Sequence, residues 1–173
     1  ATDNDMISCK SGAWWELNPQ RGRANNSVVL VRGEVSKELF DSIWKRVELS
    51  NAGEPGVYWT ADRDILSNPC VEATLRMFSF CNLTTINGDD VETQQDLNDR
   101  AAAAAFIGTL QASYTDFHYL RDIWKDVTED DALIGVSITG IGSGKILKLD
   151  LTEAANVVVD VNAKLAKMLG INP

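Results

Sequence analysis

The chain has 173 residues, of which 45% are hydrophobic, so it is long and apolar enough to fill the core of one folded domain. Its formal net charge of -9 argues against a nucleic-acid partner, because proteins that bind a phosphate backbone usually gather positive charge. Three cysteines form no disulfide framework, and neither a run of about eighteen apolar residues nor a secretory leader is found, so we expect a soluble, cytoplasmic protein without membrane contact.

The first half of the chain predicts a strand, a helix and a second strand. Residues 27–32 form a β-branched run that is typical of a strand. Ser36 is a suitable N-cap for a helix whose apolar side chains recur between residues 39 and 47. A glycine- and proline-containing break at 53–56 then precedes a strand at 57–60.

The second half repeats this alternation. A turn at 88–90 leads into a long helix, whose small side chains at 101–105 and Gly108 would permit close approach of a neighbour. Residues 133–139 form the clearest buried strand, and Asp150 with Glu153 predicts the capped start of a last helix. Strands that alternate with helices favour parallel pairing through crossover helices, so the predicted fold class is α/β.

The most informative motif is Asn-Pro-Cys-Val-Glu at 68–72, which Cys81 follows after a short interval. A thiol can donate a hydrogen atom or a proton, a carboxylate can take a proton from a hydroxyl, and a carboxamide can hold a second hydroxyl. If this segment is extended, Asn68, Cys70 and Glu72 project to one side by the two-residue period of a strand. These groups suit redox chemistry on a polyol.

The same residues permit two other interpretations. Cys70 and Cys81 can be ordinary buried small side chains, with Glu72 on a solvated face. Alternatively, the two cysteines form a thiol redox module, which requires their Cα atoms to lie within about 7 Å.

Three further residues can each be interpreted in two ways. Cys9 is either a small semi-buried side chain or a reactive thiol. His118 is the only histidine, so it predicts no imidazole metal site, and it is either structural or catalytic. Arg76 either meets a phosphate or pairs with an acidic side chain.

The motif at 68–72, with Leu-Arg and Phe-Cys-Asn-Leu downstream, resembles the active-site finger loop of ribonucleotide reductases. Other segments resemble that family in the same order along the chain: 11–16, 19–21, 24–27, 53–56, 58–60 and 133–140. The tryptophan pair, the Asn-Asn-Ser segment and the short interval between the two cysteines are most similar to the adenosylcobalamin-dependent class.

The resemblance implies a role for each residue of the motif. Cys70 would become a thiyl radical that abstracts the 3′ hydrogen of a ribonucleotide, and Glu72 would deprotonate the 3′ hydroxyl. Asn68 would hydrogen-bond the ribose, and Cys81 would be one of two thiols that reduce the sugar as the 2′ hydroxyl leaves as water. Because a stray radical is destructive, we expect Cys70 to be buried away from solvent.

The resemblance also implies part of a ten-stranded α/β barrel with a central finger loop, in which residues 1–173 form one incomplete segment. Cys9 is in the wrong place to be the partner of Cys81, and the family's arginine loop, phosphate loop and terminal shuttle cysteines are not found. A piece with roughly three to five strands leaves open edges, so we expect activity only with the remaining barrel, from another chain or a longer parent.

The predicted function is therefore ribonucleotide reduction in deoxyribonucleotide biosynthesis for DNA replication. We expect this chain to be one part of the enzyme and to be inactive when it is isolated. The resemblance implies adenosylcobalamin and an external dithiol as cofactors, and a ribonucleotide, the remaining chain or chains and a thioredoxin-like reductant as partners. Cofactor-binding residues and metal ligands are not assigned. The alternative is a non-catalytic segment that binds other chains of the enzyme.

Overall fold

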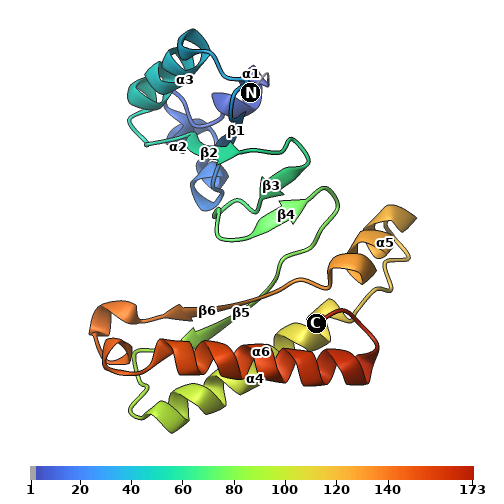
Figure 1. Cartoon of the computed structure of the whole chain (residues 1–173). Coiled ribbons are helices and arrows are strands. Elements are labelled where there is room, and N and C mark those ends of the chain that lie inside the picture. Colours follow the sequence, from blue (N-terminus) through green and yellow to red (C-terminus); the bar gives the residue numbers. More distant parts are fainter. Residues whose placement is uncertain (1–2) are drawn as a thin grey trace. The chain divides into compact units, whose positions relative to one another are not determined.

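The computed structural model describes residues 3–173, which divide into two compact units. The N-terminal unit ends at Met77, and the C-terminal unit comprises Phe78–Pro173. Both units combine helices with small sheets, and each of the three sheets in residues 3–173 has two strands (Figure 1). No helix in this range is both long and apolar enough to cross a membrane.

The N-terminal unit is built on two parallel strands joined by a helix. Its elements are α1 (Asn4–Ile7), α2 (Trp14–Leu17), η1 (Pro19–Arg23), β1 (Ser27–Val31), α3 (Lys37–Ser50), β2 (Gly56–Thr60), β3 (Ile65–Ser67) and β4 (Thr74–Arg76). β1 pairs with β2 in register from Ser27 opposite Gly56 to Val31 opposite Thr60. The predicted strand, helix and strand are therefore confirmed, with α3 as the crossover.

The core of this unit forms where α3 covers β1. Val28 and Leu30 of β1 are 4% and 1% exposed, and they cluster with Ile43 of α3 and Ile7 of α1. Ser36 caps α3 because its side chain accepts a hydrogen bond of 3.2 Å from the backbone N–H of Leu39. Alternate burial along β1 fixes which face of the strand meets the helix.

The C-terminal unit contains a second parallel pair and two long helices. Its elements are β5 (Asn82–Asn87), α4 (Gln94–Ala112), α5 (Asp122–Asp131), β6 (Ile134–Thr139), η2 (Ile141–Ser143), η3 (Ile146–Lys148) and α6 (Leu151–Leu169). β5 pairs with β6 from Asn82 opposite Ile134 to Asn87 opposite Thr139. α4 and α6 run side by side, as Figure 1 shows.

Small side chains on α4 permit the close packing that the sequence predicts. Ala101 and Ala105 are fully buried, and Ala101 belongs to the core cluster with Ile86 of β5 and Ala154 of α6. At Gly108, an added Cβ would lie 3.6 Å from the Cβ of Ile134, an ordinary van der Waals distance, so the helix packs against β6 there. The glycine and alanines of α4 thus pack against both the sheet and α6.

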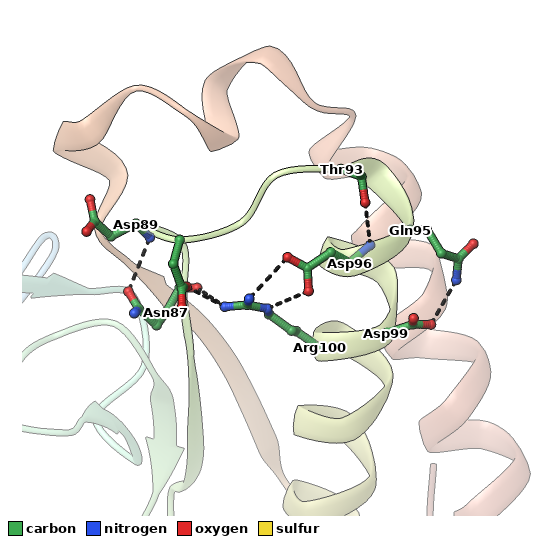
Figure 2. A network of polar contacts seen from close by, with 8 residues as sticks. Asn87, Asp89, Thr93, Gln95, Asp96, Asp99 and Arg100 are labelled. Carbon is green, nitrogen blue, oxygen red and sulfur yellow. Dashed lines mark hydrogen bonds and ion pairs between the residues drawn. The ribbon is translucent and has the colours of Figure 1, made fainter.

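One arginine fixes the connection between β5 and α4 (Figure 2). Arg100 donates to the backbone carbonyl of Asn87 at 2.9 Å and to the carboxylate of Asp90 at 2.5 Å. It also donates twice to Asp96, at 2.8 and 3.1 Å. The hydrogen bond from Arg100 lowers the pKa of Asp90 below its ordinary value. Thr93 caps the same helix through the backbone N–H of Asp96 at 3.1 Å.

The structure is mixed α and β, in agreement with the predicted class at that level. Two of the three strand pairs are parallel, β1 with β2 and β5 with β6, whereas β3 and β4 are antiparallel. The short antiparallel pair departs from the purely parallel arrangement that strand and helix alternation predicted. A hairpin connection allows only antiparallel pairing, since a parallel pair needs a longer crossover.

Candidate functional site

The motif at 68–72 lies in the loop of the β3–β4 hairpin, and we call residues 68–73 the hairpin loop. The two strands pair from Ile65 opposite Arg76 to Ser67 opposite Thr74. At the base of the hairpin loop, the N–H of Asn68 donates to the carbonyl of Ala73 at 3.2 Å. The N–H of Ala73 donates in return to the side-chain oxygen of Asn68 at 3.1 Å. One half of the Asn68 amide therefore serves to close the loop.

The hairpin loop bends where an extended segment was expected. The N–H of Val71 donates to the carbonyl of Asn68 at 3.0 Å, which closes a turn around Pro69 and Cys70. Proline favours the second position of such a turn because its φ angle is already fixed near the required value. The expectation that residues 68, 70 and 72 alternate as in a strand is therefore wrong.

Val71 adopts an uncommon backbone conformation inside this turn. Its φ angle is 69°, in the left-handed region that β-branched residues rarely enter. Such a conformation costs on the order of 1–3 kcal/mol and persists only where surrounding contacts impose it. The hydrogen bonds at Asn68 and Ala73 are contacts of that kind, so the backbone that carries Cys70 is held in a defined shape.

Exposure differs among the predicted site residues. Cys70 and Glu72 are exposed, whereas Asn68 is half-buried. The expectation that Cys70 is buried is therefore wrong for this chain, because the cysteine occupies the tip of a two-stranded hairpin. Cys81 belongs to the C-terminal unit, where it immediately precedes β5 and is half-buried. Asn68, Cys70 and Glu72 thus share one loop, and Cys81 is part of the other compact unit.

One contact at Cys70 was not predicted from the sequence. The side-chain N–H of Asn25 donates to the sulfur of Cys70 at 3.2 Å, from a position two residues before β1. The next residue, Asn26, donates its side-chain N–H groups to the carbonyl of Met6 at 2.7 Å and to the sulfur of Cys9 at 3.3 Å. In the sequence, the Asn-Asn pair stands out only through its resemblance to the family. The neighbouring residues do not indicate which side chains the two asparagines contact.

A cavity of about 340 Å³ lies beside these asparagines. Lys10 lines it, is only 7% exposed, and donates to the carbonyl of Ala24 and to the carboxylate of Glu54, the latter at 2.8 Å. Its ammonium also lies 5.6 Å from the centroid of the Trp14 ring. These contacts tie the segment before β1 to the segment before β2, so they support the backbone position of Asn25.

The remaining candidates have ordinary surroundings. Cys9 is half-buried, as one interpretation of the sequence had it, and its carbonyl accepts a hydrogen bond of 2.5 Å from Arg21. The His118 side chain is 76% exposed and lies 3.7 Å from a carboxylate oxygen of Asp116. Arg76 is a half-buried residue of β4. No group of three or more potential metal ligands occurs among residues 3–173.

Comparison with known proteins identifies no relative of this chain. No family model matches the chain, and neither a curated protein nor a solved structure does so. The motif at 68–72 and the shape of the hairpin loop are consequently the features that bear on function.

Proposed function

We propose that this chain provides the finger loop of a ribonucleotide reductase and acts together with the remainder of the catalytic barrel. The observation that carries the proposal is the hairpin loop itself. Its hydrogen-bonded turn presents a thiol at Cys70 and a carboxylate at Glu72 within one short, defined segment. A loop that enters an active site needs this combination of fixed backbone and accessible reactive groups.

Each side chain then has one task in the reaction. The sulfur radical of Cys70 takes the hydrogen atom from C3′, which forms an S–H bond and leaves a carbon radical. The carboxylate of Glu72 accepts the proton of the 3′ hydroxyl. Because the oxygen of Asn68 already accepts from Ala73, its NH₂ group is the part that donates to a ribose hydroxyl. The 2′ hydroxyl takes a proton from one of the reducing thiols and leaves as water.

Two thiols provide the electrons that replace the lost hydroxyl. Cys81 and a second thiol outside this chain give two electrons and two protons and become a disulfide. The hydrogen atom on Cys70 returns to C3′ and the proton on Glu72 returns to the 3′ oxygen, which regenerates the sulfur radical and the carboxylate. An external dithiol, such as a thioredoxin-like protein, reduces the disulfide after each turnover. The overall reaction converts a ribonucleotide and a dithiol into a deoxyribonucleotide, a disulfide and water.

Adenosylcobalamin, which the resemblance implies, does not fit the described residues. The cavity beside Asn25 is about 340 Å³, and another, between β5 and α4, is about 480 Å³. Both are small beside a corrin ring with its nucleotide arm. We assign the cofactor site, the second thiol and the cover for Cys70 to the remainder of the barrel, and no step above depends on how the radical is first generated.

The test is Cys70→Ser in the reconstituted enzyme, formed from this chain and the products of its flanking coding sequence. We expect this variant to assemble normally and to form no deoxyribonucleotide from a labelled ribonucleotide. Cys9→Ser is the matched control, because Cys9 lies outside the hairpin loop, and it should retain turnover. Turnover by the Cys70 variant at the wild-type rate would remove Cys70 from its proposed role.

The exposure of Cys70 favours a second candidate function, a non-catalytic segment that completes a barrel built by other chains. In that case both cysteine variants assemble and support the same turnover as the wild-type chain. The same experiment therefore separates the two candidates, because only the catalytic role makes turnover depend on the sulfur of Cys70.

A further inference from the structure

We infer that Asn25 is a positioning residue for the thiol of Cys70, an inference that rests on the proposed function. Its side-chain nitrogen lies 3.2 Å from the Cys70 sulfur, although the two residues are 45 positions apart in the sequence. The contact joins the segment before β1 to the tip of the β3–β4 hairpin within the N-terminal unit.

Asn25 projects from a well-anchored part of the backbone. The carbonyl of the next residue, Asn26, accepts a hydrogen bond of 2.8 Å from the N–H of Gly56. The side chain of Asn26 is fixed in turn by its donations to Met6 and Cys9. β1 begins one residue later and buries Val28. The amide of Asn25 therefore starts from a backbone that has little freedom to move.

The Cys70 side chain has more freedom than its backbone. The turn fixes the backbone, but an exposed cysteine can rotate among three staggered positions about its first side-chain bond. One hydrogen bond to the sulfur favours a single position by roughly twofold to tenfold, according to the usual strength of such bonds. Asn25 thus selects the direction in which the sulfur points.

The contact also restricts where the thiol hydrogen can lie. The Asn25 N–H can only donate, so the sulfur is the acceptor and its own hydrogen points elsewhere. For a thiol that gives a hydrogen atom to C3′ and takes one from it, a fixed direction of the S–H bond is a requirement of the chemistry.

The experiment measures alkylation of Cys70 in the whole chain with iodoacetamide at neutral pH, read by mass spectrometry of the cysteine peptides. Asn25→Asp replaces the N–H donor by oxygen with the shape conserved, and Asn25→Leu removes all polarity. We expect the Cys70 rate in both variants to differ from the wild-type rate by roughly twofold to tenfold, because the sulfur is no longer held in one position.

Cys9 is the internal reference, because its sulfur contacts Asn26 and not Asn25. Its rate should stay unchanged in both variants, which shows that the N-terminal unit is folded. A Cys70 rate in both variants that equals the wild-type rate, with Cys9 unchanged, would overturn the inference.

In the reconstituted enzyme, both Asn25 variants should lower kcat and leave KM nearly unchanged, because Asn25 orients the sulfur and does not touch the substrate. A rise in KM at constant kcat would contradict a positioning role. If Cys70→Ser retains turnover, the proposed function fails, while the alkylation result still decides whether Asn25 holds the thiol.

Discussion

Replacement of Gly140 by alanine tests the close approach of two loops at the carboxyl ends of β5 and β6. Gly140 has a φ angle of +73°, and a Cβ at this position would lie 2.6 Å from the backbone nitrogen of Asp89. Gly144 has nearly the same φ angle, +75°, but an added Cβ there meets no atom within 4 Å. The two glycines therefore differ in the free space around an added Cβ and not in backbone conformation.

The difference in space gives a difference in expected free energy of unfolding. Alanine in the left-handed region costs about 1–2 kcal/mol. The restricted unfolded chain returns about 0.4–1 kcal/mol of this, so Gly144→Ala should destabilise by about 1 kcal/mol. Gly140→Ala carries in addition an overpacking cost of about 1–3 kcal/mol, so it should destabilise by about 2–4 kcal/mol.

The loop that meets Gly140 has little room to yield. The N–H of Gly88 donates to the carbonyl of Thr139 at 2.9 Å, and the N–H of Asp89 donates to the side chain of Asn87 at 3.2 Å (Figure 2). Movement of Asp89 away from a new methyl group would disturb both hydrogen bonds. The clash is therefore with fixed backbone and not with a mobile side chain.

The assay is urea unfolding followed by far-ultraviolet circular dichroism, whose helical signal in the C-terminal unit comes mainly from α4 and α6. We expect a lower midpoint for Gly140→Ala than for Gly144→Ala at an unchanged slope. Equal midpoints for the two variants would contradict a steric clash at Gly140, since the conformational cost is common to both.

Three further changes probe the ion pairs and the core. Arg100→Met should lower the free energy of unfolding at neutral pH, and the difference from wild type should shrink in acid. The pKa of Asp90 is lowered in the folded state, so its carboxylate stabilises the fold above the ordinary aspartate pKa. This contribution is lost as the pH falls through the lowered value. A difference that stays constant across a pH series of unfolding curves would contradict this. Glu54→Ala should cost about 3–5 kcal/mol because it leaves the buried ammonium of Lys10 without its carboxylate, and Lys10→Met with Glu54→Leu should restore most of that loss in urea unfolding. Leu97→Ala, at a fully buried position, should cost about 2–5 kcal/mol, whereas Leu97→Met should cost less than about 1.5 kcal/mol by the same measurement.

The sequence predicted those features that depend on neighbours in the chain. Ser36 and Asp150 were expected to cap helices, and each does so through backbone N–H groups within three residues of itself. The side chain of Glu153 does not complete the expected capping pair, because it accepts a hydrogen bond of 2.6 Å from Asn98 of α4 instead. A partner on another helix displaced the local one, and no local pattern contains that information.

The hairpin loop was mispredicted for a different reason. Asparagine followed by proline is a turn signal, with proline at the second position, and it competes with the alternation of polar groups, which predicts an extended segment. The contact between Asn25 and Cys70 joins residues 45 positions apart, so it depends on how β1 and the hairpin fold together. The spacing of residues within either segment does not predict this contact.

The exposure of Cys70 makes burial by a partner the decisive requirement of the radical proposal. A sulfur radical in contact with water would be lost to side reactions, so the remainder of the barrel must cover the tip of the hairpin if the chemistry occurs there. Addition of that remainder should therefore slow the alkylation of Cys70 by at least about tenfold, since a covered thiol reacts only when the complex opens. The rate in the isolated chain is the reference, and formation of the complex is verified by size-exclusion chromatography. A complex that forms but leaves Cys70 as reactive as before would exclude a radical at this sulfur, and would favour the non-catalytic role.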